Sequence, residues 1–515
     1  MESFERLIAQ VTGWFQWLVG ASEGRASYDV TRWVFLRALG IIYVIAFLSL
    51  WVQIRGLIGS QGILPAAEYL DELKGYLGPE RYRLVPTVFW WGASDAALQA
   101  VCLLGAACAL LVIANLMPVP ALALLWVLYL SVSSVGRDFL AFQWDVLLLE
   151  TGFLAIFLAP GGLAPGRMAG AGGSGPSAIV LWLVWWLLFR LTFQSGLVKL
   201  TWGDPPWRDL TALDYHFYTQ PLPTWTAWFA QQAPPLLKKL VVVVMYVLEI
   251  GAPLLIFGTR EMRLVACAAT VCLQLGIMVT GNYNFFNLLT IALALTLVDD
   301  ASWTRVLPSR LVAGFTAGGG SGGTLMGAGR VALAALVLVV SAIKFWDNLS
   351  PRTSVSGAAA GFARWVDPFR SINSYGLFRV MTTVRHEIVL EGSNDGATWR
   401  AYEFKYKPGD PARRPGFVEP HQPRLDWQMW FAALERIETT PWFEPLAARL
   451  LEGSPAVLDL FATNPFPDAP PRLLRAALYD YRFTTPAERR ASGAWWERRL
   501  LGAYAPVMSL QPVPR

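Results

Sequence analysis

Charged side chains and cysteines are scarce in this chain of 515 residues. Charged residues make up only 15% of the chain, and its net charge at pH 7 is +5. So small an excess gives no support to nucleic-acid binding, and no helix-turn-helix or zinc-finger spacing occurs. The cysteines stand in apolar runs without CxxC spacing, which argues against a disulfide framework or a zinc site. They are Cys102, Cys108, Cys267 and Cys272.

Histidines are few, and the common catalytic motifs are missing. The three histidines, His216, His386 and His421, lie in separate segments, so no histidine-based metal site is predicted. The chain has no GxSxG, HExxH or Walker sequence. Its glycine-rich stretches lack the Lys-Ser/Thr end of a phosphate-binding loop. We therefore predict no metal and no nucleotide cofactor.

The chain consists instead of long uncharged runs of apolar and aromatic residues. Apolar residues make up 55% of it, and 24 residues are tryptophan. This composition is typical of an integral membrane protein, for which the lipid bilayer is the first partner. A helix needs about 20 mostly apolar residues to cross a bilayer. We therefore predict a multipass α-helical bundle with eight or nine spans, near residues 33–54, 94–116, 119–136, 139–159, 178–199, 238–258, 262–281, 283–298 and 331–346.

Five segments outside the predicted spans have a composition of their own. Residues 1–30 are amphipathic and lack a cleavage site, which predicts a helix lying on the membrane surface. Residues 55–90 and 200–237 mix aromatics, prolines and charges, which favours ordered loops that cap the bundle. The glycine-rich stretches 166–177 and 317–329 predict flexible loops.

A change of composition near residue 350 separates a transmembrane domain over 31–349 from an extramembrane domain over 350–515. Half of the 42 lysines and arginines lie beyond residue 350, and no 20-residue apolar run follows. Asn394-Asp395-Gly396 stands between two strand-like segments, which predicts a β-hairpin. In the second segment, apolar Tyr402, Phe404 and Tyr406 alternate with Glu403, Lys405 and Lys407. Residues 424–437, 442–461 and 470–483 predict short helices with a final strand, so we expect an α+β domain.

Ionisable residues also occur within the predicted spans or at their ends. Each would cost about 2.5–3.5 kcal/mol at the centre of a spanning helix, so each must pair, reach the interface or line a polar cavity. One interpretation is an ion-pair network, in which Asp145 and Glu150 meet Arg37 or Arg190 from neighbouring helices. The other is a cavity that holds a ligand or reactive group. The residues concerned are Arg37, Asp95, Asp145, Glu150, Arg190, Lys199 and Glu249.

Several stretches, in order across nearly the whole chain, resemble the lipase maturation factors. They are residues 35–65, 142–160, 193–229, 283–293, 375–396, 421–434 and 464–467. The resemblance implies a multipass membrane protein that assists folding and assembly of secreted lipases and is not itself an enzyme. In animals such proteins lie in the endoplasmic reticulum membrane, with the C-terminal domain in the lumen. With the N-terminus in the cytoplasm, nine spans would likewise place this chain's C-terminal domain on the non-cytoplasmic side, whereas eight spans would place it in the cytoplasm.

This resemblance makes a secreted hydrolase the possible client, with contacts from the hairpin and residues 421–434. The candidates are His421, Arg424, Asp426, Trp427 and Trp430, because arginine and aromatic residues are typical of interface anchors. The alternative is that Trp427 and Trp430 pack beneath the hairpin. Short loops and a composition rich in Ala, Gly, Arg and Trp are typical of bacteria, which favours a bacterial inner membrane.

A second resemblance concerns SGLVKL (195–200), followed by Trp202 and PPWRDL (205–210). This segment is similar to the vitamin K-dependent gamma-glutamyl carboxylase superfamily, which implies that Lys199 matches a lysine acting as the base at a quinone site. The alternative function is therefore a membrane-embedded enzyme with a quinone or other lipid cofactor. It predicts a lipid-sized cavity beside the span 178–199, open toward the 200–237 cap. A lysine at a helix C-terminus is also favourable without any chemistry, and the leading prediction includes no cofactor.

Overall fold

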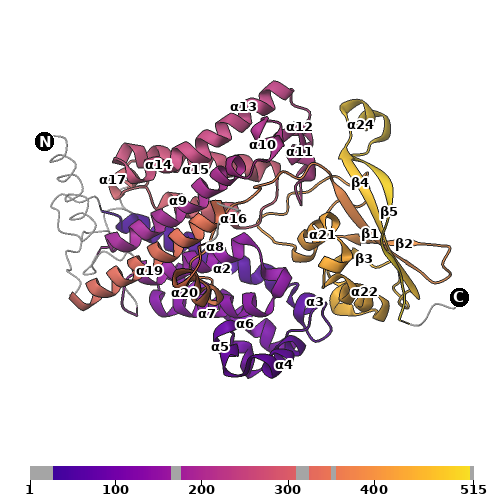
Figure 1. Cartoon of the computed structure of the whole chain (residues 1–515), viewed down its shortest axis with the longest axis horizontal. Coiled ribbons are helices and arrows are strands. Elements are labelled where there is room, and N and C mark those ends of the chain that lie inside the picture. Colours follow the sequence, from indigo (N-terminus) through magenta and orange to yellow (C-terminus); the bar gives the residue numbers. More distant parts are fainter. Residues whose placement is uncertain (1–26, 164–174, 309–323, 350–354, 511–515) are drawn as a thin grey trace.

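The computed structural model describes residues 27–163, 175–308, 324–349 and 355–510. Figure 1 shows a bundle of helices built from the first 350 residues, with a small sheet at one end built from the C-terminal part. The predicted surface helix over 1–30 lies almost entirely outside the described residues. So does most of the predicted loop 166–177, whereas part of the loop 317–329 belongs to a helix that begins at Thr324.

Seven helices in the described residues are long and apolar enough, by length and composition, to cross a membrane. They are α2 (Asp29–Trp51), α6 (Asp95–Ala114), α7 (Pro118–Val135), α9 (Ala178–Thr201), the run Pro235–Phe257 that begins with α13, α15 (Arg260–Thr280) and α19 (Thr324–Leu349). At the predicted spans 139–159 and 283–298 the helices are shorter, namely α8 (Gln143–Leu158) and α16 (Phe286–Leu295). Sixteen residues of helix extend about 24 Å, against a hydrocarbon core of about 30 Å. The multipass helical bundle is thus confirmed, with two shorter helices beside the seven.

Helix α9 forms the centre of the bundle. Its most apolar window is 83% buried, whereas the corresponding window of α15 is 22% buried and that of α19 is 17% buried. Helices α8, α16 and α19 all pack against α9. A helix that is apolar on every side must be buried in protein or in lipid. The outer helices therefore present an apolar surface to the bilayer, while α9 is enclosed by protein.

Proline residues and one irregular turn shape the helical run between Pro235 and Phe257. Pro235 is the first residue of α13 (Pro235–Tyr246), where the N–H that proline lacks would have no partner in any case. Before Pro253 the helix widens into a π-helical turn, η4 (Val247–Gly251), a feature frequent at functional sites. The run ends with α14 (Ala252–Leu254) and η5 (Leu255–Phe257).

Short helices form the loops that the sequence predicts as caps. The first cap contains α3 (Ile54–Ile58), α4 (Ala66–Leu77), η1 (Gly78–Glu80), α5 (Arg81–Leu84) and η2 (Val88–Trp91). The second contains α10 (Pro205–Arg208), α11 (Ala212–Thr219) and α12 (Trp225–Gln231). Two more short helices connect the spans, η3 (Arg137–Leu140) and α17 (Asp300–Trp303).

The C-terminal part contains one antiparallel sheet of five strands in the order β3-β2-β1-β4-β5. The strands are β1 (His386–Ser393), β2 (Arg400–Phe404), β3 (Phe461–Thr463), β4 (Leu473–Phe483) and β5 (Trp496–Met508). Strands β1 and β2 form the predicted hairpin, in which Gly392 pairs with Arg400. Gly396 in its turn has φ +72°, a conformation that suits glycine. The predicted hairpin and α+β class are thus confirmed.

The C-terminal part also contains several short helices. They are α20 (Ala358–Val366), η6 (Asp367–Phe369), α21 (Arg424–Leu434), η7 (Ile437–Thr439), α22 (Phe443–Glu452), α23 (Pro455–Leu458) and α24 (Pro486–Ser492). The last of the three segments, 470–483, contains no helix, and its residues Leu473–Phe483 form the expected final strand, β4. It lies between β1 and β5, so it pairs on both edges, and this tertiary pairing outweighs the local helical tendency of Leu and Ala.

Candidate functional site

Glu150 of α8 is fully buried and receives hydrogen bonds from both the bundle and the C-terminal part. Arg190 of α9 forms an ion pair with it. The backbone N–H of Asn373 and the hydroxyl of Tyr375 each donate to its second oxygen, at 2.8 Å. Arg190 in turn donates to the carbonyl of Asn373 at 2.7 Å. The segment at 373–375 therefore completes a polar cluster inside the bundle.

Asp145 of α8 is also fully buried, and its cation comes from the C-terminal part. Arg424 at the start of α21 lies 2.8 Å from one carboxylate oxygen and 3.0 Å from the other. The Tyr129 hydroxyl of α7 donates to the same carboxylate at 2.6 Å. Arg37, one of the cations considered from the sequence, instead lies 4.7 Å from the centre of the Trp33 ring on its own helix. The structure thus brings Asp145 to Arg424 rather than to another spanning helix.

Lys199, near the C-terminus of α9, pairs with Glu249 of the π-helical turn η4. The distance from Nζ to the carboxylate is 2.6 Å, and Nζ also donates to the carbonyl of Ser195 at 2.9 Å. Gly196 allows this approach, because a Cβ at that position would lie 2.8 Å from the Cβ of Glu249. The third charged pair therefore depends on a glycine one helical turn before the lysine.

The Lys199–Glu249 pair lies in the wall of a cavity of about 340 Å³ between α9, α13, α15 and α16. Most of its lining is apolar, and Leu213, His216 and Phe217 of the second cap also contribute. The volume falls within the range of about 300–1,000 Å³ that is usual for small-molecule sites. A cavity beside this helix and next to the 200–237 cap is what the alternative function predicted. The cavity itself, however, does not define a reaction.

Two titratable groups near the cavity have shifted pKa values. Burial and the charge of Lys199 lower the pKa of His216, in α11, to about 4, so that the imidazole is neutral at pH 7. Burial raises the pKa of Glu419 to about 7, although the N–H of Tyr283 donates to its carboxylate and favours ionisation. Tyr283 lines the cavity, and Glu419 belongs to the C-terminal part. The cavity wall is therefore linked to that part through Glu419.

Four of the five residues predicted to contact a client lie inside the protein, and the fifth, His421, is half-buried. The exposed fractions of the Arg424, Asp426, Trp427 and Trp430 side chains are 1%, 3%, 3% and 8%. Asp426 accepts the backbone N–H groups of Tyr406 and Lys407 at 2.8 Å, so that α21 holds the chain that leaves β2. Trp427 and Trp430 thus pack in the interior, which agrees with the alternative that they are core residues and not surface contacts.

The partners of these tryptophans and of His421 are residues of the bundle and its caps. Trp427 packs on Trp144 with ring centres 4.6 Å apart, and Trp430 Nε1 donates to the carbonyl of Thr219 at 2.8 Å. His421 Nδ1 lies 2.9 Å from the hydroxyl of Ser49 in α2. Segment 421–434 thus joins the C-terminal part to the bundle.

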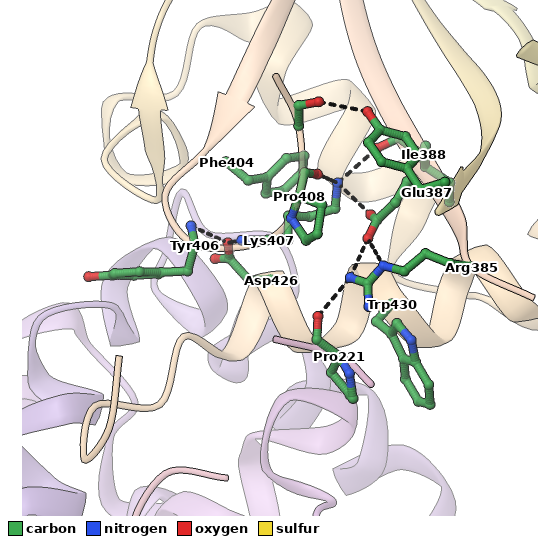
Figure 2. A network of polar contacts seen from close by, with 12 residues as sticks. Pro221, Arg385, Glu387, Ile388, Phe404, Tyr406, Lys407, Pro408, Asp426 and Trp430 are labelled. Carbon is green, nitrogen blue, oxygen red and sulfur yellow. Dashed lines mark hydrogen bonds and ion pairs between the residues drawn. The ribbon is translucent and has the colours of Figure 1, made fainter. Parts of the chain in front are cut away.

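A buried charge cluster joins the sheet to the second cap (Figure 2). Arg385 and Lys407 both pair with Glu387 of β1, at 2.6 and 2.8 Å, and all three side chains are at most 2% exposed. Arg385 also donates to the carbonyls of Tyr218, Gln220 and Pro221 in the cap. These contacts fix the orientation of the sheet relative to the bundle.

Sequence reasoning missed this cluster and the carboxylate of Glu419. Arg385 and Glu387 are two residues apart at the start of a strand, which places them on the same side, and this signal was available. Nothing in the sequence, however, distinguishes Lys407 or Glu419 from other charged residues of the C-terminal part. Lys407 pairs with Glu387, 20 residues away, and Glu419 accepts from Tyr283, 136 residues away, so only the fold brings these groups together.

Comparison with known families and proteins adds independent information. Residues 30–305 match the lipase maturation factor transmembrane domain, and residues 371–506 match the lipase maturation factor C-terminal domain. Lipase maturation factor 2 of Gallus gallus is 38% identical over an alignment of 585 positions, gaps included, which covers 93% of this chain and 81% of that protein. Lipase maturation factor 1 of Bos taurus is 37% identical over 515 residues, covering 94% and 90%. No solved structure matches the chain.

Proposed function

The chain belongs to the lipase maturation factor family, and on that premise we propose that it assists the folding or assembly of an exported, lipase-like protein. The match extends over both the helical and the α+β part, and the chain covers 81% and 90% of two relatives named for this activity. Such coverage supports a shared activity, while the identity of the client is part of the proposal.

The feature that best supports client contact is the edge strand β5. Seven successive residues, 497–503, are exposed, so neither face of the strand is covered at this point. Leu500 and Leu501 are 59% and 43% exposed and are followed by Gly502 and Ala503, whereas the preceding three residues are charged. An edge strand with an open hydrogen-bonding side can pair with a strand of another protein. We propose client contact here, because four of the five candidates in segment 421–434 are buried.

The protein is an integral multipass membrane protein, and we propose its location and orientation in more detail. Short loops and a composition rich in Ala, Gly, Arg and Trp support a bacterial inner membrane. The relatives described above come from animals, so this location is a property proposed for this chain alone. A client that is exported requires the C-terminal part on the non-cytoplasmic side.

The alternative of a lipid- or quinone-dependent enzyme receives support from the cavity beside Lys199. The contacts of Lys199, however, are those of a structural residue. Its Nζ donates to Glu249 at 2.6 Å and to the carbonyl of Ser195 at 2.9 Å, and the pair with Glu249 holds α9 to η4. We therefore retain folding assistance as the proposed function.

A secretion assay with a co-expressed lipase tests the role of β5. The variant Leu500→Asp/Leu501→Asp places charge on both faces of the exposed strand, and we expect secreted lipase activity to fall to the level without the membrane protein. Leu510→Asp is the matched control, because this leucine is 57% exposed but lies beyond the end of β5. Both variants should be produced at normal level, since exposed substitutions change stability by about 0.5 kcal/mol or less. Full lipase activity with the double variant would contradict the proposal.

A further inference from the structure

The cavity beside Lys199 opens sideways between two outer helices. Its lining residues on α9, α16 and the second cap are buried or half-buried. The exposed residues of the lining are Val241 and Val244 of α13 and Cys272 and Gly276 of α15. Both helices are candidate membrane spans with largely exposed apolar surfaces. A molecule dissolved in the bilayer can therefore reach the cavity without passing through water.

The charges around the cavity balance one another. Lys199 is matched by Glu249 in an ion pair that is almost fully buried. His216, the other basic side chain in the lining, is neutral at pH 7. A ligand that carried its own charge would leave that charge buried without a partner, which is costly. The balance of charge favours a neutral ligand.

Two buried hydrogen-bond acceptors in the cavity wall have no partner in the described residues. They are Oε1 of Gln274 on α15 and Oδ1 of Asn287 on α16, whose side chains are 5% and 0% exposed. The hydroxyls of Thr192, Ser195 and Thr290 in the same lining donate instead to carbonyls of their own helices. A buried acceptor without a donor costs about 1–3 kcal/mol. The cavity therefore lacks a hydrogen-bond donor rather than an acceptor.

We propose that this cavity binds a neutral lipid with two hydroxyl groups, which enters from the bilayer between α13 and α15 and donates one hydroxyl to Oε1 of Gln274 and the other to Oδ1 of Asn287. The hydrocarbon part of the lipid would fill the apolar space beside Leu191, Leu248 and Ile277. A quinone offers only acceptors and would leave both amide oxygens without a donor. This inference does not depend on the proposed folding function, since it concerns a different surface of the protein.

Photocrosslinking to the full chain in lipid nanodiscs tests the class of ligand. The probe is a monoacylglycerol with a diazirine in its acyl chain, compared with the fatty-acid anion and the methyl ester of the same chain. We expect the monoacylglycerol to label cavity residues of α15 and α16 at least about tenfold more than either analogue, the effect of one hydrogen bond. Equal labelling by the methyl ester, or stronger labelling by the anion, would overturn the proposal.

Variants of α15 test the location of the site. Gly276→Phe should abolish labelling, because a side chain added at Gly276 meets no atom within 4 Å and would extend into the opening. Leu275→Phe is the matched control, since Leu275 is 50% exposed on the same helix and does not line the cavity. We expect the probe to label the Leu275→Phe variant as strongly as the unaltered chain. Equal loss in both variants, or none in Gly276→Phe, would rule out this route.

A third variant separates ligand binding from folding. Gln274→Leu keeps a side chain of similar size but removes the acceptor that lacks a partner. We expect about tenfold weaker monoacylglycerol labelling together with an unchanged or higher Tm of the delipidated protein. Bound monoacylglycerol should also slow maleimide labelling of Cys272, the exposed cysteine of the lining. Unchanged labelling in Gln274→Leu would show that the hydroxyl is not recognised there.

Discussion

The guanidinium of Arg424 lies 2.8 Å from the carboxylate of Asp145, although the two residues are 279 positions apart in the chain. Asp145 belongs to a buried helix of the bundle, and Arg424 begins a helix of the C-terminal part. A second link of the same kind joins Glu150 to Tyr375. The C-terminal part therefore supplies partners to carboxylates inside the bundle, and the two parts form one cooperative structure.

We expect Arg424→Met to lower the free energy of unfolding by about 3–5 kcal/mol, because Asp145 would stay buried without its cation. Thermal unfolding of the purified protein in detergent measures this. Arg436→Met is the control, since Arg436 and its partner Glu438 are 83% and 64% exposed and such pairs contribute about 1 kcal/mol or less. Adding Asp145→Asn to Arg424→Met should recover much of the loss. Similar Tm values for Arg424→Met and Arg436→Met would contradict this account.

Removal of the C-terminal part should destabilise the bundle itself. A chain that ends at Leu349 would leave Asp145 without Arg424, and Glu150 without Asn373 and Tyr375. We expect this chain to insert in the membrane but to show a lower Tm and faster proteolysis than the full chain. The same truncation with Asp145→Asn should be the more stable of the two truncated proteins. Equal proteolysis of the full and truncated chains would show that the bundle is independent.

The Lys199–Glu249 pair allows a structural role to be separated from a chemical one. We expect Lys199→Met to cost about 3–5 kcal/mol, since Glu249 would be left buried and charged. The double variant Lys199→Met/Glu249→Gln removes both charges and should regain most of the stability. If the lysine acts only in structure, secretion of a co-expressed lipase also returns. A double variant that is stable but inactive would instead support a proton-transferring role for Lys199.

Stability should fall between about pH 5 and pH 8 because of Glu419. Its pKa in the folded protein is about 7, raised by burial from an ordinary value of 4.5. The folded state therefore holds the proton of Glu419 more tightly than the unfolded state does. The resulting contribution to the free energy of unfolding is complete below pH 4.5 and is lost as the pH rises through 7. Relative to Glu419→Gln, the unaltered chain should lose about 1–3 kcal/mol of unfolding free energy over that range.

The comparison with Glu419→Gln is needed because His421 titrates in an overlapping range with the opposite sign. Burial lowers the pKa of His421 to about 4, so its contribution is present above pH 6.5 and lost as pH falls toward 4. The unaltered chain and the Glu419→Gln variant both contain His421. The difference between their unfolding free energies, plotted against pH, therefore isolates the contribution of Glu419. A difference that does not change with pH would contradict the proposed burial of this carboxyl group.

Local pattern was sufficient to locate most elements of the fold. Long apolar runs predicted the spanning helices, and alternating residues around Asn394-Asp395-Gly396 predicted the hairpin that β1 and β2 form. The same alternation failed just beyond Phe404, where β2 ends. Tyr406 is 37% exposed, whereas Lys407 turns inward and pairs with Glu387 at 2.8 Å. A local period holds only as long as the strand continues, and tertiary contacts determine where the strand ends.

The sequence by itself determined that most of the first 350 residues form long apolar helices of a membrane protein, and that buried charges such as Asp145 and Lys199 need partners. These properties follow from hydropathy and from the cost of burying charge, and both act on each segment separately. Only the tertiary structure decided that Arg424 meets Asp145, that Glu249 meets Lys199 and that a cavity opens between α13 and α15. Many pairings would satisfy the same charges equally well, and the packing of distant segments selects one of them.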